Sequence, residues 1–215
     1  MADFTLNRRT LARAAAVVAA AALSAGALIA SSANAAVESG KPAPAFTAVD
    51  SNGKTVKLAD YRGKTVVIEW TNDGCPYVRK HYGSGNMQKL QKEATADGVV
   101  WLSVISSAPG QQGYADGPRA NKLSVERGAS PTQILLDPKG DLGHLYNAKT
   151  TPQMFIVDKA GIVAYQGAID DKPTNNPADV VGAKNYVRTA LAEIKAGKPV
   201  TPAATVSYGC TVKYE

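Results

Sequence analysis

Two cysteines carry the reactive chemistry that this sequence offers, and they lie far apart in the chain. Cys75 follows the apolar run 64–70 and is framed by Gly74 and Pro76, residue types that suit a sharp turn and the first position of a helix. A helix N-terminus favours negative charge, and Arg79 would lie one helical turn further along the same face. Both effects lower the pKa of a thiol, so we expect Cys75 to be a reactive thiolate rather than an inert core cysteine.

The second cysteine lies in a C-terminal tail with alternating residue types. Two prolines in the segment 198–202 suggest an extended arm that reaches back from the last predicted helix. We expect the arm to dock as a half-buried strand and to turn Cys210 inward toward Cys75. A redox-active pair, a permanent structural bridge and an unpaired core cysteine remain open. The residues that would share the inward face are Val206, Tyr208, Cys210, Val212 and Tyr214.

Strand-like and helix-like segments alternate through the rest of the chain. This order predicts an α/β fold with a central mixed sheet flanked by helices, an N-terminal hairpin and a strand-like C-terminal tail. Strands are expected at 46–49, 55–58, 64–70, 99–105, 132–136, 153–157 and 162–166, and helices from Pro76, from Asn86, before Gly128 and over 183–196. The turn Ser51-Asn-Gly-Lys54 joins the two hairpin strands.

The first 35 residues have the pattern of a cleaved export signal. A basic start is followed by the apolar run 14–30 and by Ala33-x-Ala35, so we expect cleavage before Ala36. The basic start resembles a twin-arginine signal, and both the Tat and the Sec routes remain open. A membrane anchor is the alternative, although the run is short and rich in alanine. We expect a periplasmic protein with a domain at 36–197, an arm at 198–215 and no membrane association after cleavage.

Composition and charge narrow the classes of partner. The chain has 215 residues, of which 45% are hydrophobic, enough for one globular core. Loss of three arginines and one aspartate with the signal lowers the formal charge from +6 to +4. No run of Lys and Arg alternates with aromatic residues, which argues against a nucleic-acid partner. The oligomeric state remains open.

Several segments together resemble the thioredoxin superfamily, and more narrowly its redoxin branch, which includes the AhpC/TSA and peroxiredoxin-like proteins. The resemblance spans residues 40–196 and implies a thioredoxin-like fold that performs thiol chemistry without a metal or another cofactor. The matching segments are Lys41-Pro-Ala-Pro-Ala-Phe46, Leu58-Ala-Asp-Tyr-Arg-Gly-Lys64, Val66-Val-Ile-Glu-Trp70, Gly74-Cys-Pro76, Thr150-Thr-Pro-Gln-Met-Phe-Ile-Val-Asp158 and Lys159-Ala-Gly161.

The resemblance also implies roles for individual residues. Thr151-Pro152 matches the cis-proline loop that faces the active cysteine, and with Pro76 and Tyr77 it would shape the substrate groove. Glu69, six residues before the cysteine, stands where thioredoxins bury an aspartate that helps to move protons. A solvated glutamate at a strand edge is the alternative for Glu69.

Departures from the family pattern decide the expected reaction. The segment Cys75-Pro-Tyr-Val78 has valine where thioredoxins carry a second cysteine, and Thr71 lies too far upstream for the peroxiredoxin arrangement. We therefore expect an exported thiol-disulfide oxidoreductase with Cys75 as nucleophile and Cys210 as resolving cysteine, acting on a thiol or disulfide protein. The alternatives are a peroxiredoxin-like enzyme that reduces small peroxides, a copper carrier using both cysteines and His81, and a binding module without chemistry.

Overall fold

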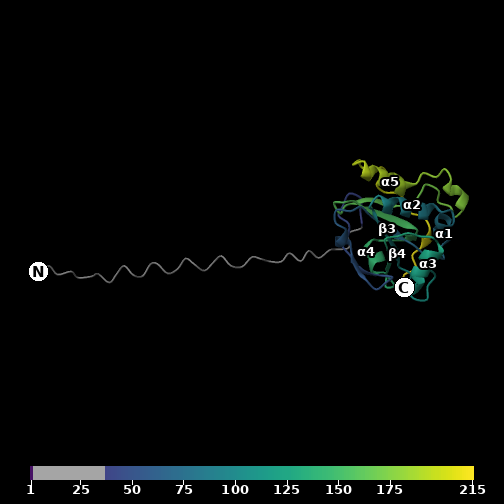
Figure 1. Cartoon of the computed structure of the whole chain (residues 1–215), viewed down its shortest axis with the longest axis horizontal. Helices are drawn as coiled ribbons and strands as arrows, with labels where there is room; N and C mark the ends of the chain where they lie inside the picture. The colour runs from purple at the N-terminus through teal and green to yellow at the C-terminus, as the bar shows by residue number, and fades with distance from the viewer. Residues whose placement is uncertain (2–36) are drawn as a thin grey trace. The chain divides into compact units, whose positions relative to one another are not determined.

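Three apolar segments form the parallel centre of the sheet in the computed structural model, which describes Met1 and residues 37–215 (Figure 1). They are β3 (Val66–Trp70), β4 (Val100–Ile105) and β5 (Gln133–Leu136), with β4 between the other two. Every residue of β3 and β4 is buried, as expected for strands that are covered on both faces. The predicted export signal and its cleavage site lie outside the described residues.

Antiparallel strands complete the sheet on both sides, which confirms the predicted mixed sheet and N-terminal hairpin. The hairpin of β1 (Thr47–Asp50) and β2 (Thr55–Lys57) pairs with β5. On the other side β7 (Gln153–Val157) pairs with β3, and β8 (Val163–Gly167) forms the far edge. The full order is β2-β1-β5-β4-β3-β7-β8.

The helices cover the two faces of the sheet unequally. Because successive parallel strands are added in the same direction, right-handed crossovers place their helices on one face. This face carries α1 (Pro76–Gly83), α2 (Asn86–Ala96), α3 (Gly117–Glu126) and α5 (Tyr186–Lys195), whereas the short α4 (Asp141–Leu145) packs on the other face. Two 3-10 helices, Leu58–Tyr61 and Pro177–Val180, lie in connections.

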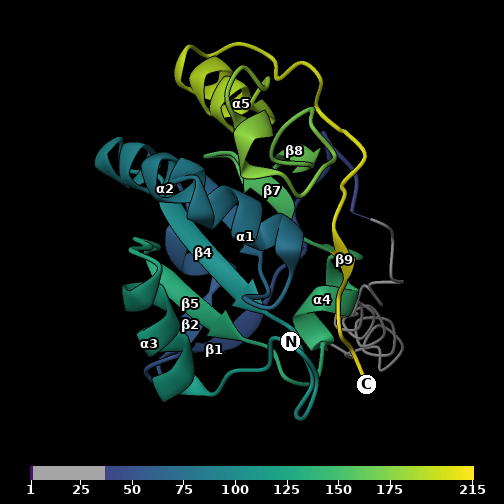
Figure 2. The same cartoon turned by 90° about the vertical axis from the view of Figure 1, so that its right-hand side faces the viewer.

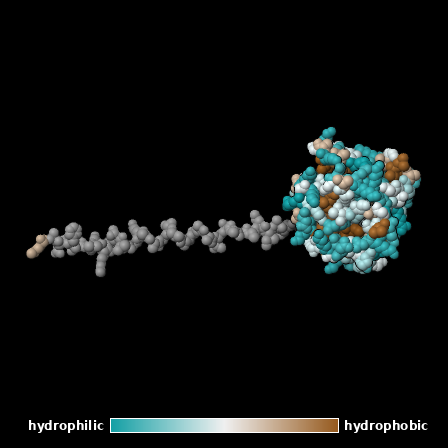
Figure 3. Space-filling model, in the orientation of Figure 1, coloured by the Kyte–Doolittle hydropathy of each residue, from teal (hydrophilic) through white to brown (hydrophobic). Residues whose placement is uncertain are grey.

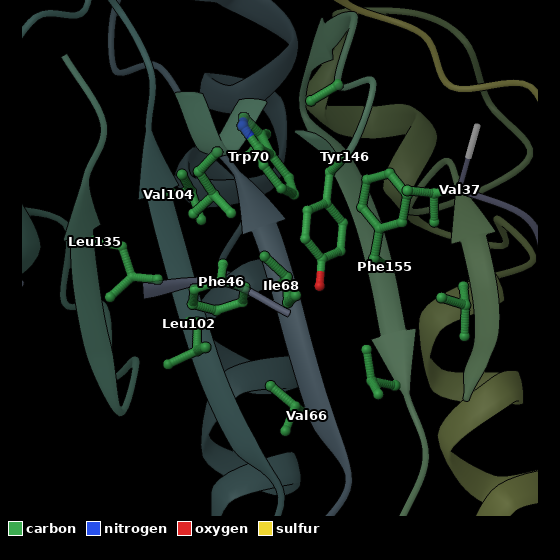
Figure 4. Packing of buried hydrophobic residues seen from close by; sticks show 14 of the residues in the cluster. Val37, Phe46, Val66, Ile68, Trp70, Leu102, Val104, Leu135, Tyr146 and Phe155 are labelled. Carbon is green, nitrogen blue, oxygen red and sulfur yellow. The ribbon is translucent and has the colours of Figure 1, made fainter. Parts of the chain in front are cut away.

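Each face of the sheet has its own apolar core. On the α4 face the aromatic rings of Trp70, Tyr146 and Phe155 pack against one another with centroids 5.3 to 5.6 Å apart (Figure 4). On the opposite face Met87 and Leu90 of α2 pack with Trp101 of β4. Residues alternate between the two cores along each central strand, which fixes the register of the sheet.

The C-terminal arm lies against the domain and belongs to the same compact unit (Figure 2). Its only strand is β9 (Cys210–Thr211), which pairs antiparallel with β6 (Thr150–Thr151). The longer predicted strand is therefore wrong, since Val206 is 90% exposed while Val212 is 5% exposed. Of the predicted inward row, Tyr208, Cys210, Val212 and Tyr214 are buried or half-buried, and Val206 alone faces solvent.

The surface of the described chain shows no large apolar area in the view of Figure 3, where apolar residues form small separate groups among polar ones. Among the residues described, none of the helices combines the length and the hydropathy needed to cross a bilayer.

Candidate functional site

Cys75 lies at the corner where β3 passes into α1. It is the N-cap residue of α1 and Pro76 occupies the first turn, in line with the residue types. The side chain of Asn72 accepts a hydrogen bond from the Gly74 amide at 2.9 Å and fixes the turn. A Cβ at Gly74 would lie 2.6 Å from the side chain of Gln112, which is exposed, and Gly74 is not among the glycines with a positive φ.

The cis peptide Thr151–Pro152 faces this cysteine. In its thiol form Cys75 donates a hydrogen bond from Sγ to the Thr151 carbonyl oxygen at 3.0 Å. The strand edge next to the proline is already paired, because Cys210 of the arm lies opposite Thr151 in the β6–β9 ladder. The groove that the resemblance predicts for a substrate is therefore occupied by the chain's own arm.

The arm brings the two cysteines together from positions 135 residues apart. The Sγ atoms of Cys75 and Cys210 are 2.6 Å apart, and both residues carry free thiols in the structure. A disulfide has sulfur atoms about 2.05 Å apart, so only a small movement separates this contact from a covalent bond. Cys75 is fully buried beneath the arm, whereas Cys210 is half-buried.

The two thiols differ in acidity. Burial raises the pKa of Cys75, but hydrogen bonds from the Cys210 thiol and from the amides of Val78 and Cys210 outweigh it, so the pKa lies below its ordinary value. Burial, followed by the hydrogen bond to Cys75, raises the pKa of Cys210 to about 11. At neutral pH Cys75 is therefore the better nucleophile and Cys210 the proton donor.

Replacing Cys210 with alanine is expected to shift the pH profile of Cys75. Without the thiol donor the Cys75 thiolate is less stable, so the midpoint of its alkylation rises toward higher pH. The measurement is the rate of iodoacetamide modification of the reduced protein between about pH 5 and 10. Val206→Ala, on the same arm but 90% exposed, should leave the midpoint unchanged. An unshifted midpoint in Cys210→Ala would show that the donor is another group.

Arg79, which was predicted to stabilise the Cys75 thiolate, makes its contacts elsewhere. Arg79 is exposed and its Nε donates to the Asp73 carbonyl at 2.7 Å, and it is not among the groups that lower the pKa of Cys75. The prediction that Arg79 stabilises the thiolate thus lacks a contact to support it.

Glu69 is fully buried, which rules out the alternative of a solvated glutamate at a strand edge. Its carboxylate accepts hydrogen bonds from Tyr82, Gln91, Trp101 and Ser103.

Pro76 and Tyr77, the other two residues predicted to line the groove, lie at the rim of the cysteine corner. Pro76 is exposed at the start of α1. The ring of Tyr77 is half-buried and packs edge-on against Tyr208 of the arm, with centroids 5.9 Å apart. Tyr77 therefore touches the segment that fills the groove.

His81, the proposed third copper ligand, uses both ring nitrogens in other contacts. Nε2 lies 3.1 Å from the Tyr208 hydroxyl, and Nδ1 lies 2.8 Å from the Asn86 amide nitrogen. Within the described part of the chain, no three or more His, Cys, Asp or Glu side chains are grouped as a metal site requires. The placement of His81 gives the copper-carrier alternative no support.

One polar cluster was not predicted from the sequence. Lys80 and His81 of α1 are fully buried, and with Asp170 they surround the hydroxyl of Tyr208. Lysine is rarely buried, so a pattern-based prediction places Lys80 in solvent. The only available signal was the apolar alternation that turned Tyr208 inward.

The chain is similar in sequence to known thioredoxin-like proteins. The AhpC/TSA family matches residues 39–166. The thiol-disulfide oxidoreductase ResA of Geobacillus kaustophilus is 30% identical over 133 residues, which cover 60% of this chain and 68% of ResA. The thioredoxin-like protein YneN of Bacillus subtilis is 27% identical over 128 residues, covering 59% of this chain and 69% of YneN.

Two solved structures share the fold over most of the chain. An uncharacterized conserved protein from Geobacillus kaustophilus superposes with a TM-score of 0.72 at 26% identity, covering 83% of this chain and 93% of that one. A hypothetical protein from Sinorhizobium meliloti 1021 gives a TM-score of 0.70 at 20% identity, covering 84% and 97%. The family match over residues 39–166 and the shared fold agree, and the chain belongs to the AhpC/TSA family of the thioredoxin-like redoxin superfamily.

Proposed function

We propose that this protein is a thiol-disulfide oxidoreductase in which Cys75 is the nucleophile and Cys210 the resolving cysteine. The observation that carries the proposal is the 2.6 Å contact between their Sγ atoms at the start of α1, beside the cis peptide Thr151–Pro152. The similarity to ResA, named as a thiol-disulfide oxidoreductase, supports the same class of reaction.

The reaction with a disulfide-bearing partner proceeds in two exchanges. The Cys75 thiolate attacks one partner sulfur, a Cys75–partner disulfide forms, and the second partner sulfur leaves as a thiolate. Cys210 then gives its proton to that thiolate and attacks the Cys75 sulfur, so that a Cys75–Cys210 disulfide forms and the partner sulfur bound to Cys75 leaves as a thiolate. This thiolate takes a proton from water, and the partner is then a dithiol. Two electrons pass from the cysteine pair to the partner, and the reverse sequence oxidises a partner dithiol.

The difference in acidity orders these two steps. Part of the increase in the Cys210 pKa comes from the hydrogen bond to Cys75 and from its charge. Both contributions disappear once Cys75 is bound in a mixed disulfide, so the pKa of Cys210 falls when a second nucleophile is needed. Cys210 therefore remains a thiol while Cys75 waits for a partner, and ionises more readily after the partner is attached.

A partner must displace part of the arm before it reaches Cys75. The sulfur of Cys75 is buried, and the edge of β6 that would bind an extended partner segment is paired with β9. The pairing involves only two residues of each strand, which makes local opening less costly than opening of the central sheet. An extended segment that carries a cysteine can then pair with the same edge.

Trapping tests the proposal. Cys210→Ser, incubated with intact insulin or another protein that contains a disulfide, should accumulate a mixed disulfide through Cys75 that dithiothreitol releases. Wild-type protein should resolve the same species, and Cys75→Ser should form none. Equal trapping by Cys75→Ser, or no trapping by Cys210→Ser at a pH where Cys75 is alkylated, contradicts the assignment of the nucleophile.

The peroxidase alternative receives less support from the site. Peroxiredoxins place a threonine hydroxyl near the reactive cysteine, whereas Thr71 Oγ1 is buried and has no hydrogen-bond partner among the described residues. We therefore propose disulfides rather than peroxides as the substrate class.

We also propose that the protein is exported to the periplasm and starts at Ala36 after cleavage. The support is the basic start, the apolar run and the Ala33-x-Ala35 pattern of the sequence. An oxidising compartment would supply disulfides for the exchange. N-terminal sequencing of protein from the periplasmic fraction should begin at Ala36, and an uncleaved cytoplasmic product would overturn this proposal.

A further inference from the structure

A buried ion pair lies behind the reactive cysteine. The side chain of Lys80 is completely buried, although an ammonium group is normally retained in water. Its Nζ donates to the Lys172 carbonyl at 2.6 Å and lies 3.4 Å from both carboxylate oxygens of Asp170. Such a pair is stable only when further hydrogen bonds satisfy the two charges.

The backbone of Lys172 supplies some of those bonds, since its amide donates to Oδ1 of Asp170 at 3.0 Å, and the hydroxyl of Tyr208, an arm residue, supplies others. This hydroxyl donates to Oδ1 of Asp170 and lies 3.3 Å from Nζ of Lys80 and 3.1 Å from Nε2 of His81. Asn86 donates its amide hydrogen to Nδ1 of His81, which leaves the proton on Nε2 and points it at Tyr208. Three side chains of the domain therefore converge on a single hydroxyl of the arm.

At neutral pH the protonation states of His81 and Tyr208 fix the direction of the hydrogen bonds around the Tyr208 hydroxyl. Burial lowers the pKa of His81 to about 4, since the opposing effect of Asp170 is smaller, and the imidazole is neutral. Burial and the hydrogen bond to Asp170 raise the pKa of Tyr208, so the phenol retains its proton. The hydroxyl thus donates to the carboxylate and accepts from the imidazole, with one arrangement satisfying both partners.

Lys80, His81 and Asp170 together with the Tyr208 hydroxyl form a cluster that we call the clamp. The clamp is close in the chain to both reacting sulfur atoms, that of Cys75 and that of Cys210. Cys75 is the N-cap of α1, the helix that carries Lys80 and His81, and Tyr208 is two residues before Cys210. The ring of Tyr208 is further held by the edge of Tyr77. Any loosening of the phenol therefore changes the position of one sulfur relative to the other.

We propose that Tyr208, held by Lys80, His81 and Asp170, is the positioning residue that keeps Cys210 against Cys75. The inference rests on the proposed function, because it concerns how readily the pair forms its disulfide. The clamp touches no substrate. It sets the effective concentration of the Cys210 thiol at Cys75, and hence the equilibrium between the dithiol and the disulfide.

Tyr208→Phe tests the proposal because it keeps the ring and removes the hydroxyl. The equilibrium constant for forming the Cys75–Cys210 disulfide against glutathione should fall about tenfold to a hundredfold, the range for hydrogen bonds to charged groups. His81→Leu, which removes one of the contacts, should shift the constant in the same direction by less. Val206→Ala is the matched control on the exposed part of the arm and should match wild type.

Hydrogen exchange of the reduced proteins provides a readout that does not depend on redox chemistry. Amides of residues 203–215 should exchange faster in Tyr208→Phe, while those of β3 and β4 should keep their wild-type rates and show that the domain is folded. If the equilibrium constant for forming the Cys75–Cys210 disulfide against glutathione is the same in wild type and in Tyr208→Phe, the positioning role is overturned and the proposed function is left intact. A wild-type protein that forms no Cys75–Cys210 disulfide overturns the proposed function and the positioning role together.

Discussion

Gly209→Ala is expected to detach the arm from the cysteine corner and to abolish the disulfide between Cys75 and Cys210. Gly209 has a φ of +141°, a backbone conformation that residues with a side chain rarely adopt. A Cβ at this position would lie 2.1 Å from the Thr151 carbonyl oxygen and 2.7 Å from its carbon. Because both atoms belong to the backbone beside the cis proline, the clash can be relieved only by moving the arm.

Alkylation at high pH measures this opening. The rate of iodoacetamide modification is compared on the high-pH plateau of each protein, where the Cys75 thiol is ionised and the rate reports access rather than acidity. Access should rise at least about tenfold in Gly209→Ala, since the pairing that covers Cys75 costs more than about 1.4 kcal/mol to break. At neutral pH the increase should be smaller, because the variant also loses the Cys210 hydrogen bond that stabilises the thiolate.

Gly182→Ala is the matched control for Gly209→Ala. Gly182 also has a positive φ, +78°, but a Cβ there would meet no atom within 4 Å. This variant therefore carries backbone strain without a clash, and its Cys75 should remain as protected as in wild type. A normal Cys75–Cys210 disulfide in Gly209→Ala would show that the arm does not depend on this close approach.

Glu69→Ala is expected to lower the free energy of unfolding by about 3 to 5 kcal/mol. The buried carboxylate accepts hydrogen bonds from Tyr82, Gln91, Trp101 and Ser103, which join β3 to β4, α1 and α2. Its removal leaves these donors without an acceptor in a closed interior, and each unsatisfied donor costs about 1 to 3 kcal/mol before the structure relaxes.

Urea unfolding of the reduced proteins checks the effect of Glu69→Ala. Glu93→Ala removes an exposed carboxylate that pairs with Arg188 and Lys89, and it should cost less than about 1 kcal/mol. If the free energy of unfolding of Glu69→Ala also lies within about 1 kcal/mol of the wild-type value, the hydrogen bonds to Glu69 do not stabilise the interior as expected. Comparison of Glu69→Gln with wild type in the rate of disulfide exchange against pH then tests the proton-transfer role implied by the resemblance.

The parts of the fold that depend on local signals could be predicted from the sequence. The apolar β-branched runs of β3 and β4 identify buried parallel strands, and the sequence Gly74-Cys-Pro76 marks a helix start. Both signals arise from backbone geometry and burial within a few residues, so no tertiary information is needed to interpret them.

Features that depend on contacts between distant segments could not be predicted in the same way. Arg79 lies in the helix one turn after Cys75, as its spacing predicts, but its side chain donates to the Asp73 carbonyl and not to the thiol. Alternation placed Val206 inward with Tyr208, yet Val206 faces solvent between the bridge from Ala204 to Gln166 of β8 and the β6–β9 pairing. Lys80 is buried because Asp170 and Tyr208, 90 and 128 residues away, complete its contacts.

A redox titration of the wild-type protein, with the disulfide located by mass spectrometry of non-reduced peptides, tests whether Cys75 and Cys210 form a redox-active pair. We expect a reversible two-electron transition in which peptides containing Cys75 and Cys210 become linked, with a midpoint between about −270 and −120 mV, the range of thiol-disulfide enzymes. Failure of these peptides to link would contradict the pairing. A link that persists below about −300 mV would identify a permanent structural bridge and contradict the proposed catalytic cycle.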